Sequence, residues 1–451
     1  MRFPLLLLAT VSLAGCTAGA DYVRPEIALT PQFLAAPAIA PPDADWWAGF
    51  GDPLLERFVA AALANNTDLA QARARMEQSR AAAKGAGAVL LPSMGATGDA
   101  TSVSQSRETP VGKVTQILGL PRGYSEYAVG TQASWEIDLF GGLRRGREAA
   151  RAELGAAEAS EGAMRIAVAA ETADAYLTLR ALQARLAIAA SQEGVQARLA
   201  DLVRQRVGQG IAAERELNRA TGAPPGANRT LLAAAGPIPR APTPAGSAAP
   251  ADLLRRRPDV VAAERRLAAA NARIGVALAD YYPHLSLSGL LGVASLGTGN
   301  LFTGGAVQAS GGAGLRWRLF DFGRVDAEVA QARGARAAQL AAWRGSVLAA
   351  AEDVETALSR LAEAQAEGEA LARQVAALTI ARAQAEQAYR GGVTGLIDVL
   401  DADRELLAAR DRAASVQAEQ ARAAVAAYRA LGGGWAAEGG GALALQAAGP
   451  R

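Results

Sequence analysis

The fold of this chain is decided by the segment Trp135-Glu136-Ile137-Asp138-Leu139-Phe140-Gly141, which returns as Trp317-Arg318-Leu319-Phe320-Asp321-Phe322-Gly323, an offset of 182 (317 − 135). Upstream, a run that opens at Asp68 and ends at Pro92 is repeated by a run that opens at Asp259 and ends at Pro283, an offset of 191 (259 − 68). A long unit duplicated in tandem predicts a pseudosymmetric molecule in which each half supplies matching parts.

The repeated segments close two runs of alternating residues. Residues 127–139 alternate between a mainly apolar face and a polar face, and 307–319 repeat the pattern. Residues 285–293 form a further alternating run, and 93–106 a fainter one. A period of two predicts four strands, two per repeat.

Strands of this length with one apolar and one polar face fit a transmembrane β-barrel. Four strands cannot close a barrel, and open strand edges are not tolerated in lipid. If the strands cross a membrane, several chains must therefore share one barrel. A soluble four-stranded sheet is the alternative that the strands alone leave open.

A very long helix is predicted after each second strand. Residues 143–208 and 324–390 carry apolar residues mostly three or four positions apart and contain no proline. About 66 residues at about 1.5 Å each give a coiled-coil helix on the order of 100 Å, long enough to cross a compartment. Glycines at 391–395 end the second helix, and a return helix is predicted over 396–431.

The first repeat lacks a matching return helix. Gly392 to Gly432 spans 40 positions (432 − 392), whereas the corresponding Gly210 to Gly222 spans 12 (222 − 210). The difference of 28 residues corresponds to four heptads, about 42 Å of helix. Either the first helix bends back early, or this copy carries an internal deletion; a natural short variant with a compensating register is the further alternative.

The N-terminus is predicted to be a targeting segment. An apolar stretch from Phe3 to Leu13, too short to span a bilayer, runs into Leu13-Ala14-Gly15-Cys16, which resembles a bacterial lipobox. Cys16, the only cysteine, is therefore the predicted lipidation site, and three acyl chains would anchor the chain stably. An ordinary secretory peptide is the alternative. Thr17, where an aspartate would favour the inner membrane, indicates the outer membrane.

The remaining composition argues against several classes of protein. A formal charge of +2 gives no electrostatic attraction for nucleic acid. No later apolar run reaches 18 residues, so no transmembrane helix is predicted. His284 is the only histidine, and no zinc spacing, nucleophile elbow or phosphate loop is present. We therefore expect no enzymatic activity, no metal and no cofactor other than the covalent lipid.

The predicted organisation has six parts. They are a signal peptide (1–15); a lipidated, Pro-rich extended arm that docks through Trp46, Trp47 and Phe50 (16–62); repeat 1, which begins with a helix over 63–90 and ends in a truncated return helix (63–222); a Pro-rich linker (223–252); repeat 2 (253–435); and a flexible C-terminal tail (436–451).

Four stretches of the sequence are distinctive. They are the lipobox followed by Asp21-Tyr22-Val23-Arg24-Pro25, then Leu253-Leu254-Arg255-Arg256-Arg257-Pro258-Asp259, then Ala262-Ala263-Glu264-Arg265-Arg266-Leu267, and the closing Ala430-Leu431-Gly432-Gly433-Gly434-Trp435. Together they resemble the lipoprotein branch of the TolC-like outer-membrane efflux proteins. The resemblance implies an α+β membrane protein in the outer membrane that extends into the periplasm. It implies a homotrimer in which each protomer gives four strands to one twelve-stranded β-barrel above a periplasmic α-helical barrel. It also implies a periplasmic adaptor and an inner-membrane pump as partners.

The segment from Tyr389 to Ala402 resembles the part of the family that closes the periplasmic entrance. By this resemblance Asp398 and Asp401 line the pore constriction, and Tyr389 helps to hold the entrance shut. Thr394 stands where some members have an arginine. Rings of carboxylates at a constriction favour cations. The alternative for the two aspartates is charge at a helix start, which the helix dipole favours.

The competing class is a lipid-anchored periplasmic coiled coil that links envelope layers, or an adaptor. An adaptor would carry a lipoyl-like β-domain inside one helical hairpin, and the sequence shows no sign of one. The two duplicated strand pairs favour the exit channel. An internally deleted channel with impaired function remains open, and the exported substrates cannot be read from the sequence.

Overall fold

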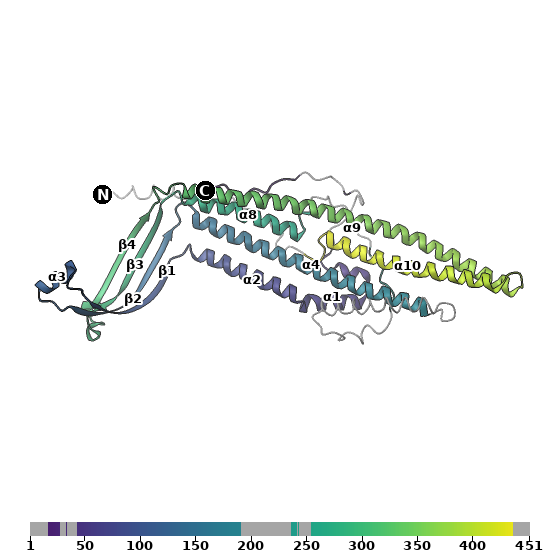
Figure 1. Ribbon diagram of the computed structural model, residues 1–451, viewed down its shortest axis with the longest axis horizontal. Helices are drawn as coiled ribbons and strands as arrows, with labels where there is room; N and C mark the ends of the chain where they lie inside the picture. Colours follow the sequence, from purple (N-terminus) through teal and green to yellow (C-terminus); the bar gives the residue numbers. More distant parts are fainter. Residues whose placement is uncertain are drawn as a thin grey trace, which may run out of the picture. The chain divides into compact units, whose positions relative to one another are not determined.

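The computed structural model describes residues 17–27, 33, 43–190, 236–240, 242 and 254–435 (Figure 1). The chain divides into a sheet unit (1–23, 79–154 and 266–339) and a helical unit (24–78, 155–265 and 340–451). The predicted signal peptide, Cys16, the first long helix beyond residue 190, the truncated return helix and the C-terminal tail lie outside the described residues, as does most of the linker.

The sheet unit holds the four predicted strands. They are β1 (Ser93–Ser104), β2 (Gly123–Ile137), β3 (His284–Ser295) and β4 (Val307–Arg316). They form one antiparallel sheet in the order β1-β2-β3-β4, visible in Figure 1 as four neighbouring arrows. Strands β2 and β3 join repeat 1 to repeat 2, and β1 and β4 are the two edges.

The tandem duplication is visible in the bounds of the first elements of each repeat. Helix α8 (Pro258–Ala279) begins and ends 191 positions after α2 (Thr67–Ala88), and β3 keeps the same offset from β1. Helix α9 begins at Arg324, 182 positions after the first residue of α4, Gly142. The predicted internal repeat is therefore confirmed.

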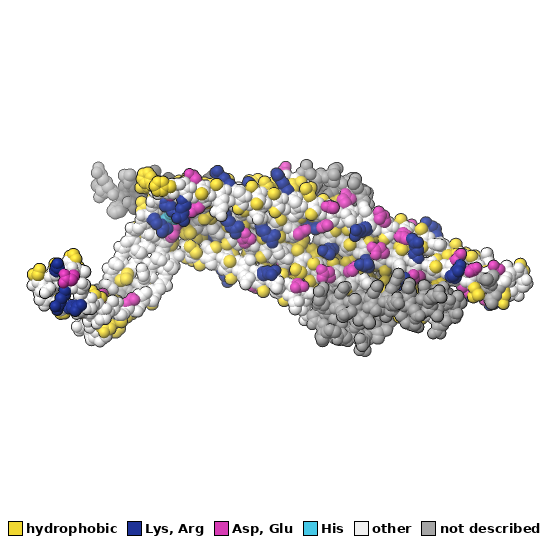
Figure 2. All heavy atoms as spheres, in the orientation of Figure 1, with side chains coloured by type: hydrophobic (Ala, Val, Ile, Leu, Met, Phe, Trp, Pro, Cys, Tyr) yellow, Lys and Arg dark blue, Asp and Glu magenta, His cyan; other side chains and the backbone are white. Residues whose placement is uncertain are grey.

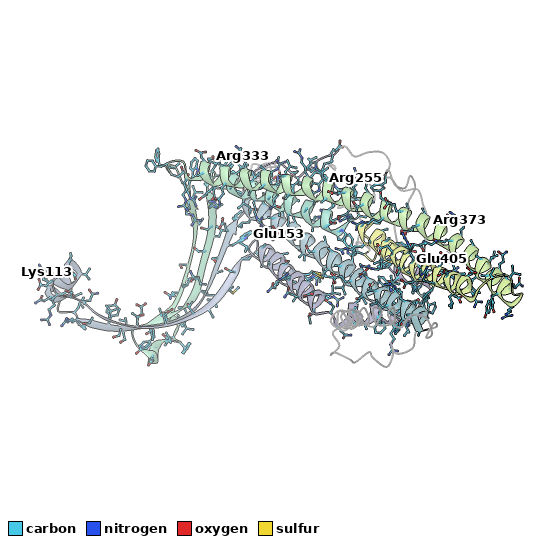
Figure 3. All side chains as sticks on the ribbon, turned by 45° about the vertical axis from the view of Figure 1, so that its right-hand side comes forward. Lys113, Glu153, Arg255, Arg333, Arg373 and Glu405 are labelled. Atoms are coloured by element: carbon cyan, nitrogen blue, oxygen red, sulfur yellow. The ribbon has the colours of Figure 1, made fainter. Side chains whose placement is uncertain are left out.

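The change of offset from 191 to 182 lies in the loop between the two strands of each repeat. Residues 105–122 carry the helix α3 (Pro110–Ile117), whereas 296–306 carry only the short 3-10 helices η3 (Thr298–Asn300) and η4 (Gly304–Ala306). The Thr109 hydroxyl caps α3 by accepting a bond from the Gly112 amide at 3.2 Å. Lys113 on α3 is labelled in Figure 3. The loop between the two strands is therefore longer in repeat 1 than in repeat 2.

Long helices make up the helical unit and continue into the sheet unit. Helix α9 (Arg324–Arg390) is one uninterrupted helix of 67 residues, as predicted, and α10 (Leu396–Ala430) follows it. Helix α4 (Gly142–Ala190) covers the described part of the first predicted long helix. The apolar residues of α9 at three- and four-residue spacing include Val354, Leu358, Leu361 and Leu371, which are buried, and Val375 and Leu378, which are half-buried. The apolar side chain of Leu400 near the start of α10 is 38% exposed.

No described helix carries an apolar stretch long enough to cross a bilayer.

The extended arm predicted up to residue 62 is wrong in its second half, where the chain is helical. The 3-10 helix η2 (Trp46–Phe50) is followed by α1 (Pro53–Asn65). The Asp52 carboxylate accepts bonds from the amides of Leu54 at 2.9 Å and Leu55 at 3.3 Å, and Pro53 occupies the first helical position. An Asp-Pro pair is a strong helix start. The helix expected over 63–90 is therefore two helices, which meet at Asn66.

The docking of the arm through its aromatic side chains is confirmed. Trp46, Trp47 and Phe50 are buried, and the Trp46 ring stacks on Tyr428 of α10 with centroids 5.3 Å apart. Tyr176 of α4 donates a hydrogen bond to Asp52 at 2.7 Å. Burial of the phenol, together with this bond, raises the pKa of Tyr176 to about 12. The arm is thus fixed to both α4 and α10 in the helical unit.

The start of the arm is held within the sheet unit by the buried guanidinium of Arg145. Its Nε donates to the Ala18 carbonyl at 3.1 Å and its Nη2 to the Gly19 carbonyl at 2.8 Å, and Nη2 also pairs with Asp21 at 2.8 Å. Gly275 of α8 makes room for the arm, since a Cβ there would lie 2.7 Å from the Ala18 carbonyl oxygen. Residues 18–21 are therefore a docked segment.

Candidate pore entrance and helical wall

A tight glycine turn reverses the chain between α9 and α10. The Val393 amide donates to the Ala388 carbonyl at 2.9 Å and the Gly392 amide to the Tyr389 carbonyl at 3.0 Å, while Gly392 adopts a φ of 74°. These bonds satisfy the last carbonyls of α9 in a Schellman arrangement. The turn therefore places Tyr389 and the two predicted aspartates at the same end of one hairpin.

Asp398 and Asp401 lie in the first turns of α10 and are both exposed. One Asp398 oxygen accepts a bond from the Gly395 amide at 3.0 Å, which is the local role expected of an acid at a helix start. The Asp401 carboxylate forms an ion pair with the Arg404 guanidinium, with Oδ1 3.4 Å from Nη2. Residues three apart share a helix face, so the two carboxylates form one acidic strip on α10.

Tyr389 occupies the last turn of α9 and is 43% exposed. Among the described residues, no hydrogen bond joins Tyr389 to either aspartate. The hydroxyl of Thr394, which stands at the arginine position of some relatives, is buried and has no hydrogen-bond partner among the described residues. Within one copy, Tyr389, Asp398 and Asp401 thus lie at the same end of the α9–α10 hairpin, and no hydrogen bond between the described residues connects Tyr389 to the two aspartates.

Near the turn, α9 and α10 are joined by Arg382, which was not predicted from the sequence. Its Nε donates to Asp403 of α10 at 2.9 Å, and its Nη1 donates to Glu386 at 2.6 Å. The hydrogen bond and charge of Asp403 raise the pKa of Arg382 above its ordinary value. Arg382 and Asp403 stand at nearly equal distances from Gly392 along the sequence, so pairing the two arms of the hairpin would have found them. In Figure 3 the same two helices carry the labelled Arg373 and Glu405.

Two arginine–carboxylate pairs fix α10 beside α4. Arg185 donates two bonds to Asp411, at 2.7 and 2.8 Å, and Arg422 donates to Asp174 at 2.7 and 3.3 Å. The hydrogen bond to Asp411 raises the pKa of Arg185 in spite of burial. Paired bonds of this kind fix orientation as well as distance. The described part of α4 therefore finds its neighbour in the return helix of the other repeat.

Arg257 of the Arg255-Arg256-Arg257 run holds the C-terminal end of α10. Its Nη1 donates to the Ala430 carbonyl at 2.9 Å, its Nη2 to Asp259 at 2.7 Å, and the same nitrogen to Asp353 at 3.1 Å. Burial disfavours the charge, but the hydrogen bonds and charges of Asp259 and Asp353 outweigh it and raise the pKa of Arg257. The motif noted in the sequence is thus a structural anchor.

A polar groove of about 1200 Å³ lies within the helical unit. Its walls carry charges of both signs together with small residues, among them Asp68, Glu171, Asp174, Glu352, Asp353, Arg257, Arg360, Arg422 and Arg429. Figure 2 shows basic and acidic side chains interspersed over these helices. A surface of mixed charge suits contact with water more than a dry interface. Over the described residues, no group of three potential metal ligands is present.

The chain belongs to the outer membrane efflux protein family, whose model matches it twice, over residues 59–241 and 249–433. Two matches in one chain agree with the tandem repeat. The family assignment and the fold class predicted from the sequence are confirmed, and the protein is an outer-membrane efflux protein.

Among its relatives is the pyoverdine export outer membrane protein OpmQ of Pseudomonas putida, 32% identical over 97% of this chain and 98% of that protein. Outer membrane protein OprJ of Pseudomonas aeruginosa is 29% identical, with 95% of both chains covered. Among solved structures, the outer-membrane channel OprN is 33% identical with a TM-score of 0.78, covering 93% of this chain and 99% of that one. The open state of the MtrE outer membrane channel of Neisseria gonorrhoeae is 26% identical with a TM-score of 0.79, covering 93% and 98%.

Proposed function

We propose that three copies of this chain form the exit duct of a tripartite efflux system. The duct takes small molecules from a periplasmic adaptor and an inner-membrane pump and releases them outside the cell, and it is not an enzyme. The observation that carries the proposal is the sheet, whose edge strands β1 and β4 have no further strand partner among the described residues. Lipid does not satisfy open backbone groups, so the edges need partners, and further copies of the chain supply them.

The family relation supports the export role. One relative is named for pyoverdine export and another, at 30% identity, for toluene efflux. The named cargoes share little chemistry, so we assign this duct no particular substrate.

Lipidation at Cys16 is the second part of the proposal. Its support is the lipobox together with the docking of the next residues, where the Ala18 amide donates to the Phe140 carbonyl at 2.8 Å. This bond holds Ala18, two residues after Cys16 in the sequence, close to the residues that follow β2. Radiolabelled palmitate should enter the wild type and not Cys16→Ser, and equal labelling of both would remove this part.

Asp398 and Asp401 are the proposed pore constriction, and Tyr389 the proposed gating residue beside them. In a trimer, two exposed carboxylates per copy give two acidic rings, which favour cations. Replacing both by alanine should raise single-channel conductance and lower cation preference. Glu419→Ala, a loss of an exposed carboxylate further along α10, is the matched control and should change neither. An unchanged reversal potential in a salt gradient for the double variant would exclude the pore-lining role.

The short first hairpin gives a further proposal about this copy. The alignment with OpmQ extends over 468 positions, more than the 451 residues of this chain, so it contains gaps in this chain. A gap total of this size agrees with an internal deletion. The second candidate function is therefore an internally deleted duct that supports efflux weakly or not at all. Inserting 28 residues patterned on 404–431 after Ala220 should improve trimer yield and drug export, whereas a Gly/Ser insert of equal length should not. Full resistance conferred by the unmodified chain on a strain without its own duct would refute the deletion.

A further inference from the structure

A short helix with an exposed apolar face lies in the loop between β1 and β2. Helix α3 (Pro110–Ile117) lies beyond the ends of these two strands (Figure 1). Its C-terminal end is closed as firmly as its capped start, since the Leu120 amide donates to the Thr115 carbonyl at 2.9 Å and Gly119 adopts a φ of 65°. The helix is therefore a formed element of the loop and not a passing turn.

Helix α3 packs on its own loop through its polar side. Gly112 is its only buried residue, and a Cβ there would overlap the Ser106 carbonyl oxygen, at 1.7 Å. Only glycine allows so close an approach of the two backbone segments. The apolar side chains lie on the side of the helix away from Gly112, within an arc of about 120° at about 100° per residue. They are Val111 (57% exposed), Val114 (53%), Ile117 (83%) and Leu118 (65%), with Leu120 (55%) directly after them.

Basic side chains border this apolar face. Lys113 lies one turn before Ile117 at the edge of the apolar arc, and Arg107 and Arg122 flank the helix in the loop; all three basic residues are exposed. Glu108 is the only acidic residue of the loop. Figure 2 shows hydrophobic and basic side chains together at this end of the sheet unit. An apolar arc bordered by basic residues is typical of a helix that lies in the plane of an anionic lipid surface.

We propose that α3 docks on the outer leaflet of the outer membrane, with its apolar face at the acyl-chain boundary and Lys113 against the phosphates of anionic lipids. The proposal rests on the trimeric duct proposed above, which puts the strands in the membrane and this loop outside. Strands β1 and β2, of 12 and 15 residues, rise about 30–40 Å at a tilt of about 40°, whereas the apolar band of such barrels is about 25 Å tall. The loop therefore leaves the barrel within the head-group layer.

Attachment to the strands makes so short a helix sufficient for docking. A free helix of eight residues is marginal in water and buries too little apolar surface to hold a membrane by itself. In this loop the caps form the helix beforehand, and the strand ends keep it at the membrane surface. The entropy cost of binding is therefore small, as for any second contact made within one molecule.

A contact among the three α3 helices of a trimer is the other way to cover the apolar faces. It would gather three Lys113 side chains around one apolar cluster, and α3 itself carries no acidic residue to compensate them. Like charges brought together at an apolar surface repel one another and lose hydration. Lipid phosphates instead supply the opposite charge, so charge complementarity favours the membrane.

Dyes placed on the two sides of α3 test the docking. Ile117→Cys on the apolar face and Gln116→Cys on the opposite side are labelled with an environment-sensitive dye in the full-length protein. The wild type, whose only cysteine is Cys16, gives the labelling background. In vesicles of phosphatidylcholine and phosphatidylglycerol, emission from position 117 should shift to the blue and be quenched by lipids brominated on their acyl chains. Emission from position 116 should stay accessible to iodide in the water.

The role of charge is tested by Lys113→Gln in the Ile117→Cys background. One cation near an anionic surface changes binding about fivefold, so the ratio of docked to undocked loop should fall by about that factor in the anionic vesicles. In vesicles of phosphatidylcholine alone the ratio should not change. The matched control is Lys84→Gln, which removes the only other lysine, an exposed residue of α2, and should change neither.

Each outcome supports or overturns the docking. Lipid quenching at 117 but not at 116 that depends on anionic lipid and on Lys113 supports it. Accessibility of position 117 to iodide in both kinds of vesicle overturns it, and so does quenching that is equal with and without anionic lipid. Shielding of position 117 from iodide without lipid quenching shows contact between neighbouring α3 helices and overturns it as well. In these cases the duct stands if the variants remain trimers that conduct ions, whereas a wild type that stays monomeric on native gels refutes the duct itself.

Discussion

Replacing Arg257 by alanine removes the contact that joins the start of α8 to the end of α10. The Arg257 side chain is 10% exposed and donates to Asp259, Asp353 and the Ala430 carbonyl. Its loss leaves a carbonyl and a half-buried carboxylate without their partner. We expect unfolding of the helical unit to become easier.

The size of the effect follows from the exposure of each partner. Removing one member of a fully buried pair costs about 3–5 kcal/mol. The Asp259 side chain is 45% exposed and Asp353 is 62% exposed, so water recovers part of this cost. The unpaired Ala430 carbonyl adds about 1–3 kcal/mol. A net loss of about 2–3 kcal/mol corresponds to a fall in melting temperature of roughly 5–10 °C for a unit of this size.

The melting temperature should be followed by the helical circular dichroism signal in detergent. Arg256→Ala, which removes an exposed arginine next in sequence, should lower it by less than about 2 °C. Arg257→Lys should fall between the two, because an ammonium keeps the charge but not the planar fork. Equal melting temperatures for wild type and Arg257→Ala would refute the anchoring role.

Two further predictions concern acid and the docked arm. Burial opposes the charge on Asp259, but the hydrogen bond and charge of Arg257 lower the pKa of this carboxyl below its ordinary value. The stabilisation by the Arg257–Asp259 pair is therefore present above the ordinary pKa and is lost as pH falls through the lowered pKa. The difference in melting temperature between wild type and Arg257→Ala should therefore shrink below about pH 4, and a constant difference down to pH 2 would contradict the pairing. Gly275→Ala places a Cβ 2.7 Å from the Ala18 carbonyl and should speed proteolysis of the arm, although alanine favours helix by about 1 kcal/mol. Gly334→Ala, in open space on α9, should leave the arm resistant, and equal cleavage of both variants would show that Gly275 has no such role.

Features with a local or repeated signal could be predicted from the sequence. The alternation of apolar and polar residues located β2 and β4, and duplication supported the fainter β1 through its counterpart β3. The 67-residue helix α9 was predictable from its three- and four-residue apolar spacing and the glycines that end it.

Features that depend on distant partners could not be predicted. The bonds from Tyr176 to Asp52 and from Arg257 to Ala430 join residues 124 and 173 positions apart, and no local pattern marks either pair. Helix α1 was missed for another reason. The Asp52-Pro53 start was present in the sequence, but the prolines upstream favoured an extended interpretation of the whole arm. At the entrance, the resemblance located Asp398 and Asp401 but not the bond between Arg382 and Asp403.

A tryptophan lies at the helix-side end of each strand pair, and its indole nitrogen donates a hydrogen bond to a backbone carbonyl. The Nε1 of Trp135 donates to the Leu90 carbonyl at 3.0 Å, and that of Trp317 donates to the Tyr281 carbonyl at 3.0 Å. In the proposed trimer these become six indoles at a single level. Tryptophan prefers the boundary between hydrocarbon and water, and such rings flank the apolar band of outer-membrane barrels. The duplicated tryptophans would therefore fix the position of the β-barrel along the membrane normal, even in a copy that lacks its N-terminal acyl chains.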